Sequence, residues 1–327
     1  MKAIVITKPG GPEVLQLQEV EEPTVLANQV LVRVRATALN RADLLQRRGI
    51  YRPAGSQRGD IAGLEFAGEV ESVGQLAQKW KSGDRVMGIL AGQGYAEKAS
   101  VSEGMLLSIP DHLSFEEAAS IPETFMTAYD AIFPQLELKL GESLLVHAIG
   151  SGVGIAALQL AKVAGCKVYG TSSSQDKLLQ AKELGLDCGI NYKEQDFEEI
   201  ILSETNDRGV DAILDMVGAP YWDKNMSCLT RAGRLIVVGF MGGAKAKVNL
   251  GIILSKRIRI FGTALNPRPL EDKVMLVCDF EKNVIPLFIA GKLKPIVDEI
   301  FPLEEAAQAH AYMEANSNFG KIVLKVS

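Results

Sequence analysis

Cysteine and histidine are scarce in this chain. Its 327 residues include four cysteines and three histidines, and residues 1–165 contain no cysteine. The cysteines are widely spaced, at Cys166, Cys188, Cys228 and Cys278. This spacing excludes a disulfide framework and suits a reducing compartment. The histidines are His112, His147 and His310, and none has a neighbour at zinc-ligand spacing, so we expect no metal centre. His147 closes an apolar segment and is expected to be a hydrogen-bonded core residue.

Long apolar runs are missing as well. The most apolar stretch, residues 144–161, is interrupted by His147, Ser151, Gln159 and three glycines. It is typical of a strand, a turn and a helix rather than of a membrane span. The first residues form only a short apolar segment before Lys8, so no signal peptide is expected. We therefore expect a cytoplasmic protein with no membrane partner.

Positive charge is not in excess. The chain has 35 basic and 40 acidic residues, a net charge of −5 and a sequence pI near 5.5. Such a balance provides no general attraction to nucleic acid, and we expect no nucleic-acid partner. The densest basic segments are Arg47-Arg48 and residues 256–259. The second alternates like a strand, and we interpret its charges as solvated strand positions.

The remaining composition is that of a globular protein, with 47% apolar and 23% charged residues. The length predicts about two domains. The first part of the chain is rich in predicted strands, because residues 29–36 alternate valines with arginines and similar short segments follow. The further strands are expected at 65–72, 85–90, 95–101 and 106–109. This pattern favours a compact, partly antiparallel barrel or sandwich.

The pattern changes near Ser114, where Ser114 followed by Glu117 is typical of a helix capping box. From residue 144 onward, short apolar strands alternate with helices, which predicts a doubly wound parallel sheet. The strands are expected at 144–148, 167–171, 189–191, 210–215, 234–238 and 259–264, with helices at 152–164 and 176–184. A helix over 306–313 and a strand over 321–326 complete the α/β pattern.

The most informative segment runs from Leu144 to Gly154, LLVHAIGSGVG. A buried strand leads into a glycine-rich turn and then into an apolar helix. Glycines let the backbone approach a pyrophosphate, and the helix N-terminus offers free N–H groups. An ATP loop is excluded because its lysine is missing, and a nucleophile elbow is excluded because Ile149 replaces its first glycine. The turn predicts a dinucleotide site.

The second predicted strand of this sheet indicates which dinucleotide binds. A carboxylate at its end would hold the 2′-hydroxyl of NAD. This chain instead has Thr171 followed by three serines, with Lys177 shortly afterwards. Small hydroxyls and a cation favour a 2′-phosphate, so we predict NADP.

Several stretches distributed over the whole chain share one further pattern. They are Ala38–Asp43, Gln46–Tyr51, Gly63–Glu65, Ile121–Glu123, Asn191–Lys193, Gly239–Gly243, Met313–Asn316 and Gly320–Leu324. Together with the glycine turn, these stretches resemble the zinc-independent quinone oxidoreductase branch of the medium-chain dehydrogenase/reductase superfamily. The resemblance implies a β-rich GroES-like catalytic domain over 1–122 and 291–327, and a Rossmann NADP-binding domain over 123–290. It also implies NADPH as cofactor and a homodimer formed through an edge strand.

The resemblance assigns roles to individual residues. Ser173, Lys177 and Tyr192 match positions that hold the 2′-phosphate, and Asn40 and Tyr51 match catalytic positions that flank a substrate cleft between the domains. Ser151 departs from the family's paired glycines, and its hydroxyl can still donate to a phosphate. The remaining implied cofactor residues are Thr127, Gly152, Val153, Gly154, Gly239, Phe240, Met241 and Lys321.

The implied reaction is hydride transfer from NADPH to a quinone, an ortho-quinone being favoured. It requires mainly that two rings be held face to face, and the product can take protons from water, so Tyr51 would only orient the substrate. One alternative is reduction of a 2-alkenal or enoyl double bond, in which Tyr51 would donate a proton. Another is a non-catalytic NADPH-binding protein.

Overall fold

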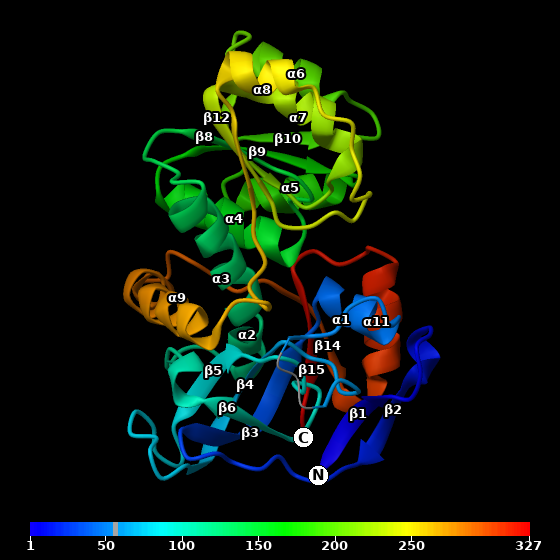
Figure 1. The fold of residues 1–327 in the computed structure, drawn as a ribbon, viewed down its shortest axis with the longest axis vertical. Helices are drawn as coiled ribbons and strands as arrows, with labels where there is room; N and C mark the ends of the chain where they lie inside the picture. The colour runs from blue at the N-terminus through cyan, green and yellow to red at the C-terminus, as the bar shows by residue number, and fades with distance from the viewer. Residues whose placement is uncertain (55–57) are drawn as a thin grey trace. The chain divides into compact units, whose positions relative to one another are not determined.

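The computed structural model describes residues 1–54 and 58–327 (Figure 1). The chain divides into two compact units, unit 1 with residues Met1–Met126 and Leu265–Ser327, and unit 2 with residues Thr127–Ala264. No helix of the described ranges is long and apolar enough to cross a bilayer.

The boundaries differ from those expected from the sequence. The first falls inside α3 (Pro122–Asp130), close to the predicted residue 122. The second falls before Leu265, so residues 265–290 belong to unit 1 and not to the dinucleotide domain. The cause is packing of α9 (Leu270–Asn283) and α10 (Ile285–Ile289) on unit 1. Lys79 forms an ion pair with Glu281 at 2.9 Å, and the rings of Phe125 and Phe288 lie 4.8 Å apart.

Unit 1 is β-rich, as predicted. Its main sheet has seven strands in the order β14-β15-β3-β4-β5-β7, with β6 also paired to β3, and a separate pair joins β1 to β2. Valines at 30, 32 and 34 are buried on β3, whereas Arg33 and Arg35 pair with Glu71 and Glu69 on β4. The strands are β1 (Lys2–Ile6), β2 (Leu15–Glu19), β3 (Gln29–Ala38), β4 (Glu65–Val73), β5 (Arg85–Ile89), β6 (Lys98–Ser102), β7 (Leu106–Ser108), β14 (Val297–Pro302) and β15 (Lys321–Lys325).

Helices α1 (Arg41–Arg47), α2 (Phe115–Ala119) and α11 (Ala306–Glu314) complete unit 1, with short turns η1 (Pro12–Val14), η2 (Glu103–Met105) and η5 (Leu303–Glu305). The predicted capping box of α2 is confirmed. Ser114 Oγ accepts from the Glu117 amide at 3.2 Å, and Glu117 Oε2 accepts from the Ser114 amide at 2.8 Å.

Unit 2 is the predicted doubly wound parallel sheet. Its strand order is β10-β9-β8-β11-β12-β13, and every pair is parallel. Helices α4 and α5 cover one face, and α6, α7 and α8 cover the other (Figure 1). The strands are β8 (Ser143–Val146), β9 (Lys167–Ser172), β10 (Cys188–Asn191), β11 (Val210–Asp215), β12 (Leu229–Val237) and β13 (Arg259–Gly262). The helices are α4 (Gly152–Val163), α5 (Gln175–Glu183), α6 (Phe197–Glu204), α7 (Trp222–Cys228) and α8 (Leu250–Lys256), with η3 (Ala131–Gln135) and η4 (Ala219–Tyr221).

One sequence interpretation in unit 2 is wrong. Lys256 is not a solvated strand position, because it ends α8, and the strand β13 begins only at Arg259. The Lys256 ammonium donates to the carbonyls of Met226, Ser227 and Leu229 at 2.7–3.0 Å. These carbonyls lie at the end of α7, so Lys256 caps that helix. Helix α8 ends at Lys256 because Arg257 adopts a left-handed backbone conformation. The alternation of residue types carries no information about that backbone conformation, so it does not reveal where the helix ends.

A series of buried polar side chains, joined by hydrogen bonds, fixes α1 within unit 1. Arg47, which is 1% exposed, places Nη1 at 3.3 Å from His310 Nδ1, and His310 Nε2 lies 3.1 Å from the Tyr95 hydroxyl. A guanidinium can only donate, so Nδ1 accepts and Nε2 carries the proton. The Tyr95 hydroxyl then donates to Asp43 Oδ2 at 3.2 Å. Asp43 also accepts from the amides of Asn40 at 2.7 Å and Gly63 at 3.1 Å, which anchors the start of α1.

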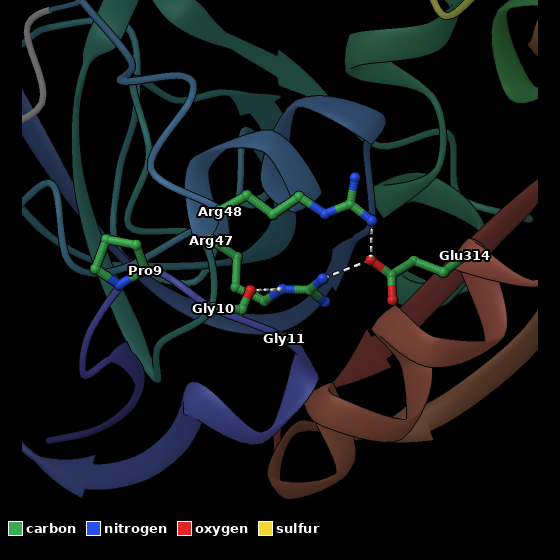
Figure 2. Close-up of a pocket in the computed structure, with 6 residues that line it drawn as sticks. All are labelled: Pro9, Gly10, Gly11, Arg47, Arg48 and Glu314. Atoms are coloured by element: carbon green, nitrogen blue, oxygen red, sulfur yellow. Dashed lines mark hydrogen bonds and ion pairs between the residues drawn. The ribbon is translucent and has the colours of Figure 1, made fainter.

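Arg47, at the outer end of this hydrogen-bonded series, lines a surface pocket. The pocket is formed by Pro9, Gly10, Gly11, Arg47, Arg48 and Glu314 (Figure 2). Arg47 and Arg48 both point to Glu314 and donate to the same carboxylate oxygen. None of the site residues expected from the sequence lines this pocket.

His310 makes the stability of the fold acid-sensitive. Burial, followed by the charge of Arg47, lowers the pKa of His310 to about 3. Its stabilising contribution is therefore complete above the unfolded pKa of 6.5 and is lost as the pH falls toward 3. We predict that the free-energy difference of unfolding between wild type and His310→Gln shrinks by about 2.5 kcal/mol from pH 7.5 to pH 4.5. Urea unfolding at the two pH values measures this, and a pH-independent difference would contradict it.

Candidate functional site

The glycine-rich turn of unit 2 forms an anion cradle. Ser151 is the N-cap of α4, and its Oγ accepts from the Gly154 amide at 3.1 Å. A Cβ atom at Gly154 would lie 2.6 Å from the Ala148 carbonyl oxygen, so only glycine fits there. The amides of Gly152 and Val153 are in the first helical turn and have no carbonyl one turn earlier to bond. With the positive end of the helix dipole, they fit the pyrophosphate of a dinucleotide.

The sheet order reverses beside this turn. The chain runs from β8 to β9 and β10 on one side and then crosses to β11 on the other. In open parallel sheets, ligands bind at the carboxyl ends of the strands where such a reversal occurs. The glycine turn follows the carboxyl end of β8, so the observed topology and the predicted dinucleotide site coincide.

His147 ties the strand ends together at this point. It is fully buried, with Nε2 at 2.7 Å from Asn225 Oδ1 and Nδ1 at 3.0 Å from Thr171 Oγ1. The Asn225 amide donates to Asp215 Oδ2 at 3.0 Å. Burial lowers the pKa of His147, so the ring is neutral. The expectation that His147 is a hydrogen-bonded core residue is confirmed.

The segment 239–241 lies at the carboxyl end of β11. Asp215 Oδ1 accepts from the amides of Val217 and Gly218 at 2.7 and 3.0 Å. The Met241 amide donates to the Met216 carbonyl at 3.2 Å, which holds the segment beside the strand end. Phe240 and Met241 are 61% and 57% exposed. Two large apolar side chains therefore stand at the edge where the dinucleotide site is expected. Thr127, by contrast, is buried on α3.

The structure also brings Ser173 and Tyr192 together. Strands β9 and β10 are parallel neighbours, with Ser172 in register with Asn191, so the two residues leave adjacent strand ends. The Tyr192 amide donates to the Ser172 carbonyl at 3.1 Å. Lys177 lies in the first turn of α5, where Ser174 Oγ accepts from its amide at 3.4 Å. Ser173 and Tyr192 at these strand ends, with Lys177 in the helix that follows β9, offer the types of donor that bind a phosphate monoester.

In unit 1, the centre of the candidate site is a buried ion pair. Glu65 begins β4 and is fully buried, and its Oε1 lies 2.7 Å from Lys321 Nζ. The same oxygen accepts from Asn40 Nδ2 at 2.9 Å, and Oε2 accepts from the Glu123 amide at 2.8 Å. Both oxygens are therefore hydrogen-bonded and the charge is compensated, which a buried carboxylate requires.

This arrangement bears on Lys321, for which the family resemblance implies a place among the cofactor-binding residues. Its ammonium donates to Glu65, to the Leu39 carbonyl and to Asn40 Oδ1. An ammonium has three N–H groups, and here all three have partners inside unit 1. The side chain is only 5% exposed. The structure thus places Lys321 as the counter-ion of Glu65, and it does not support contact with a phosphate.

Asn40 is also fully engaged within unit 1. Its side-chain nitrogen Nδ2 donates to Glu65 Oε1 and to the Ala38 carbonyl, the latter at 3.3 Å, and its side-chain oxygen Oδ1 accepts from Lys321. Because these polar atoms hold the ion pair in place, Asn40 acts as a positioning residue rather than as a group free to react.

Tyr51 and Glu123 are two residues of unit 1 whose side chains carry an ionisable proton. Tyr51 is half-buried, and burial together with the charges of Glu123 and Asp43 raises the pKa of its phenol well above the ordinary range. Glu123 is partly exposed, and burial followed by the charge of Glu65 raises its pKa to about 8. No pattern in the sequence marks Glu123 as a site residue. A glutamate in the first turn of a helix is common, and only the fold brings Glu65 beside it.

The residues of unit 1 and unit 2 do not fit a zinc ion. Within residues 1–54 and 58–327, no three His, Cys, Asp or Glu side chains gather closely enough to hold a metal. Both ring nitrogens of His147 and of His310 are already hydrogen-bonded. At the Glu65 carboxylate, the Lys321 ammonium already supplies the positive charge.

Two family models match the chain, the GroES-like domain of alcohol dehydrogenases over residues 26–111 and the zinc-binding dehydrogenase domain over residues 152–276. The quinone oxidoreductase of Rattus norvegicus is 32% identical over 99% of this chain and 97% of its own length. The structure of an NAD-dependent alcohol dehydrogenase is 31% identical, with a TM-score of 0.90 over all of both chains. The Escherichia coli quinone oxidoreductase complexed with NADPH is 30% identical, with a TM-score of 0.89 over 99% of this chain and 100% of its own.

The Glu65–Lys321 pair can be tested by double substitution. Lys321→Met leaves the Glu65 charge buried without a counter-ion, which should cost about 3–5 kcal/mol of unfolding free energy. Adding Glu65→Gln removes that charge, and we expect the double variant to recover at least half of the loss. Urea unfolding of the single and double variants provides the comparison. A Lys321→Met variant as stable as wild type would show that the pair does not carry this role.

Proposed function

Because the chain belongs to the quinone oxidoreductase branch of the medium-chain dehydrogenase/reductase superfamily, we propose that it reduces quinones with NADPH. The observation that carries this proposal is the anion cradle of Ser151–Gly154 combined with the hydroxyl and ammonium groups that follow β9 and β10. The Escherichia coli relative, which was solved with NADPH, supports the choice of cofactor.

The residues of unit 2 would bind NADPH, which supplies the hydride when bound. The amides of Gly152 and Val153, with the Ser151 hydroxyl, would hold the pyrophosphate. Ser173, Lys177 and Tyr192 would hold the 2′-phosphate. The nicotinamide would lie against the remaining predicted residues, Thr127, Gly239, Phe240 and Met241.

Unit 1 would bind the quinone. The Tyr51 phenol keeps its proton over the whole physiological range, since its pKa is raised. It would therefore donate a hydrogen bond to a quinone oxygen and orient the ring. Asn40 would contribute indirectly, by holding the Glu65–Lys321 pair. Orientation of the two reactants supplies much of the rate enhancement in such a transfer.

We further propose that the protein is a cytoplasmic homodimer. Among the described residues, the edge strand β13 of the unit 2 sheet pairs only with β12, and Ile260 on it is exposed. Exposed Leu250 and Leu254 precede it on α8. An unpaired strand edge with apolar neighbours supports pairing with a second copy.

Steady-state oxidation of NADPH and of NADH by an ortho-quinone tests the function directly. We expect turnover that favours NADPH at least tenfold. Turnover with a 2-alkenal but not with a quinone would instead support double-bond reduction. Cofactor binding with neither acceptor reduced would support a non-catalytic NADPH-binding protein.

Lys177 allows a sharper test of the cofactor site. A charge-assisted hydrogen bond is worth about 1.5–3 kcal/mol, so Lys177→Gln should raise the KM for NADPH by about 10- to 100-fold and leave the KM for NADH unchanged. Lys182→Gln, at the other end of the same helix, is the control and should behave as wild type. An equal effect of Lys177→Gln on both cofactors would argue against a phosphate contact.

Tyr51→Phe distinguishes orientation from proton donation. Because the phenol holds its proton tightly, we expect quinone turnover to fall less than tenfold, mainly through KM. A loss of kcat of about 100-fold or more would identify Tyr51 as the proton donor.

A further inference from the structure

The segment that carries Tyr51 is hydrogen-bonded at both ends. It follows α1, and at its start the amides of Ile50 and Tyr51 donate to the Leu45 carbonyl at 2.9 and 3.2 Å. At its other end, the Ala54 amide donates to Asn266 Oδ1 at 2.6 Å. The first contact is local, whereas Asn266 lies 212 residues farther along the chain than Ala54. The course of this segment therefore depends on a distant side chain.

The Tyr51 phenol is the polar group that the segment presents. The side chain is half-buried, and its hydroxyl makes no hydrogen bond with any residue that the structure describes. A phenol can both donate and accept, so this hydroxyl is available to a ligand. With no internal partner for the hydroxyl among the described residues, the backbone that carries Tyr51 sets the direction of its ring.

Asn266 is itself held in place from the side of α9. It belongs to residues 265–269, which lead into that helix, and its carbonyl accepts from Lys273 Nζ at 3.2 Å. Pro267 follows it and restricts its backbone to extended conformations. Leu265, which precedes it, is buried. The side-chain oxygen of Asn266 is therefore a fixed acceptor for the Ala54 amide.

Glu123 is a common neighbour of these two parts of unit 1. The Tyr51 phenol and the Lys273 ammonium both interact electrostatically with its carboxyl. The Glu123 amide in turn donates to Glu65 Oε2 at 2.8 Å. The Tyr51 segment and the start of α9 thus lie in the same part of unit 1 as the buried ion pair, where the substrate is proposed to bind.

We propose that Asn266 is a positioning residue for the substrate site, because its side-chain oxygen holds the Tyr51 segment so that the phenol points toward the substrate. This inference rests on the proposed quinone reductase function, in which Tyr51 orients the quinone. Asn266 acts through the backbone of Ala54, without touching the substrate itself. Its loss should weaken quinone binding through Tyr51 and leave the cofactor site unchanged.

The activity test compares wild type with Asn266→Ala, which removes the acceptor, and with Asn266→Asp, which keeps an acceptor oxygen. The control is Asn283→Ala, which changes an exposed asparagine of unit 1 whose side chain bonds to Asp279 within α9. Asn266→Ala should raise the KM for an ortho-quinone about three- to tenfold, with kcat and the KM for NADPH unchanged. Asn266→Asp should restore most of the wild-type KM, and Asn283→Ala should follow wild type.

A double substitution separates positioning of Tyr51 from a general structural role. In the Tyr51→Phe background, Asn266→Ala should change the quinone KM by less than about twofold, because the hydroxyl that Asn266 orients is already gone. Equal effects of Asn266→Ala in both backgrounds would overturn the proposal. An Asn266→Asp variant that behaves like Asn266→Ala would do the same, since the acceptor oxygen would then have no role.

The surroundings of Tyr51 can also be followed without any reaction. Carbon-13 NMR of the tyrosine Cζ atoms, with the Tyr51 resonance assigned by its loss in Tyr51→Phe, reports on the phenol directly. We expect this resonance to shift in Asn266→Ala and to return to its wild-type position in Asn266→Asp. An unchanged Tyr51 resonance in Asn266→Ala would overturn the proposal.

The outcomes separate this inference from the function on which it rests. If wild type reduces quinone and Asn266→Ala matches it in KM and in the Tyr51 resonance, the role of Asn266 is refuted and the proposed function stands. If wild type reduces no quinone under any condition, the proposed function fails and the role of Asn266 in substrate binding falls with it.

Discussion

Burying the Glu65 carboxylate at the start of β4 imposes the condition on which the unit 1 site depends. Because water does not reach this carboxylate, the protein must supply hydrogen bonds to both oxygens and a positive charge beside them. Lys321, Asn40 and the Glu123 amide meet these needs from three different elements. Once the lysine is committed to Glu65, a second carboxyl placed nearby ionises with difficulty. Burial, followed by the charge of Glu65, accordingly raises the pKa of Glu123 to about 8.

Unit 2 also contains a buried carboxylate, that of Asp215, with donors from several elements. Asp215 ends β11 and receives two backbone amides and the Asn225 side chain, and Asn225 in turn holds neutral His147 at the end of β8. This network places the glycine turn and the 239–241 segment at one edge of the sheet. In each unit, one buried carboxylate collects donors from several elements, and the groups that could contact ligand are held at the margin of that network.

Local patterns in the sequence were sufficient for most of the secondary structure. The alternation along β3, the capping box of α2 and the strand–turn–helix at Gly154 follow from short-range rules, and the structure confirms them. Long-range packing was not accessible in the same way. The sequence patterns do not reveal that residues 265–290 pack on unit 1, that Lys256 caps α7, or that Lys321 pairs with Glu65. In each case the partner lies far away in sequence. The setting of Glu123 has the same origin, since the Glu65 carboxylate that its backbone amide contacts lies 58 residues earlier.

The protonation state of Glu123 is the most direct measure of this account. Carbon-13 NMR of the glutamate side-chain carboxyls, with the Glu123 resonance assigned by its loss in Glu123→Gln, follows that state without any reaction. The account predicts a resonance that titrates near pH 8 in wild type and at lower pH when Glu65→Gln removes the neighbouring charge. A Glu123 resonance that titrates near 4.5 in wild type would contradict it.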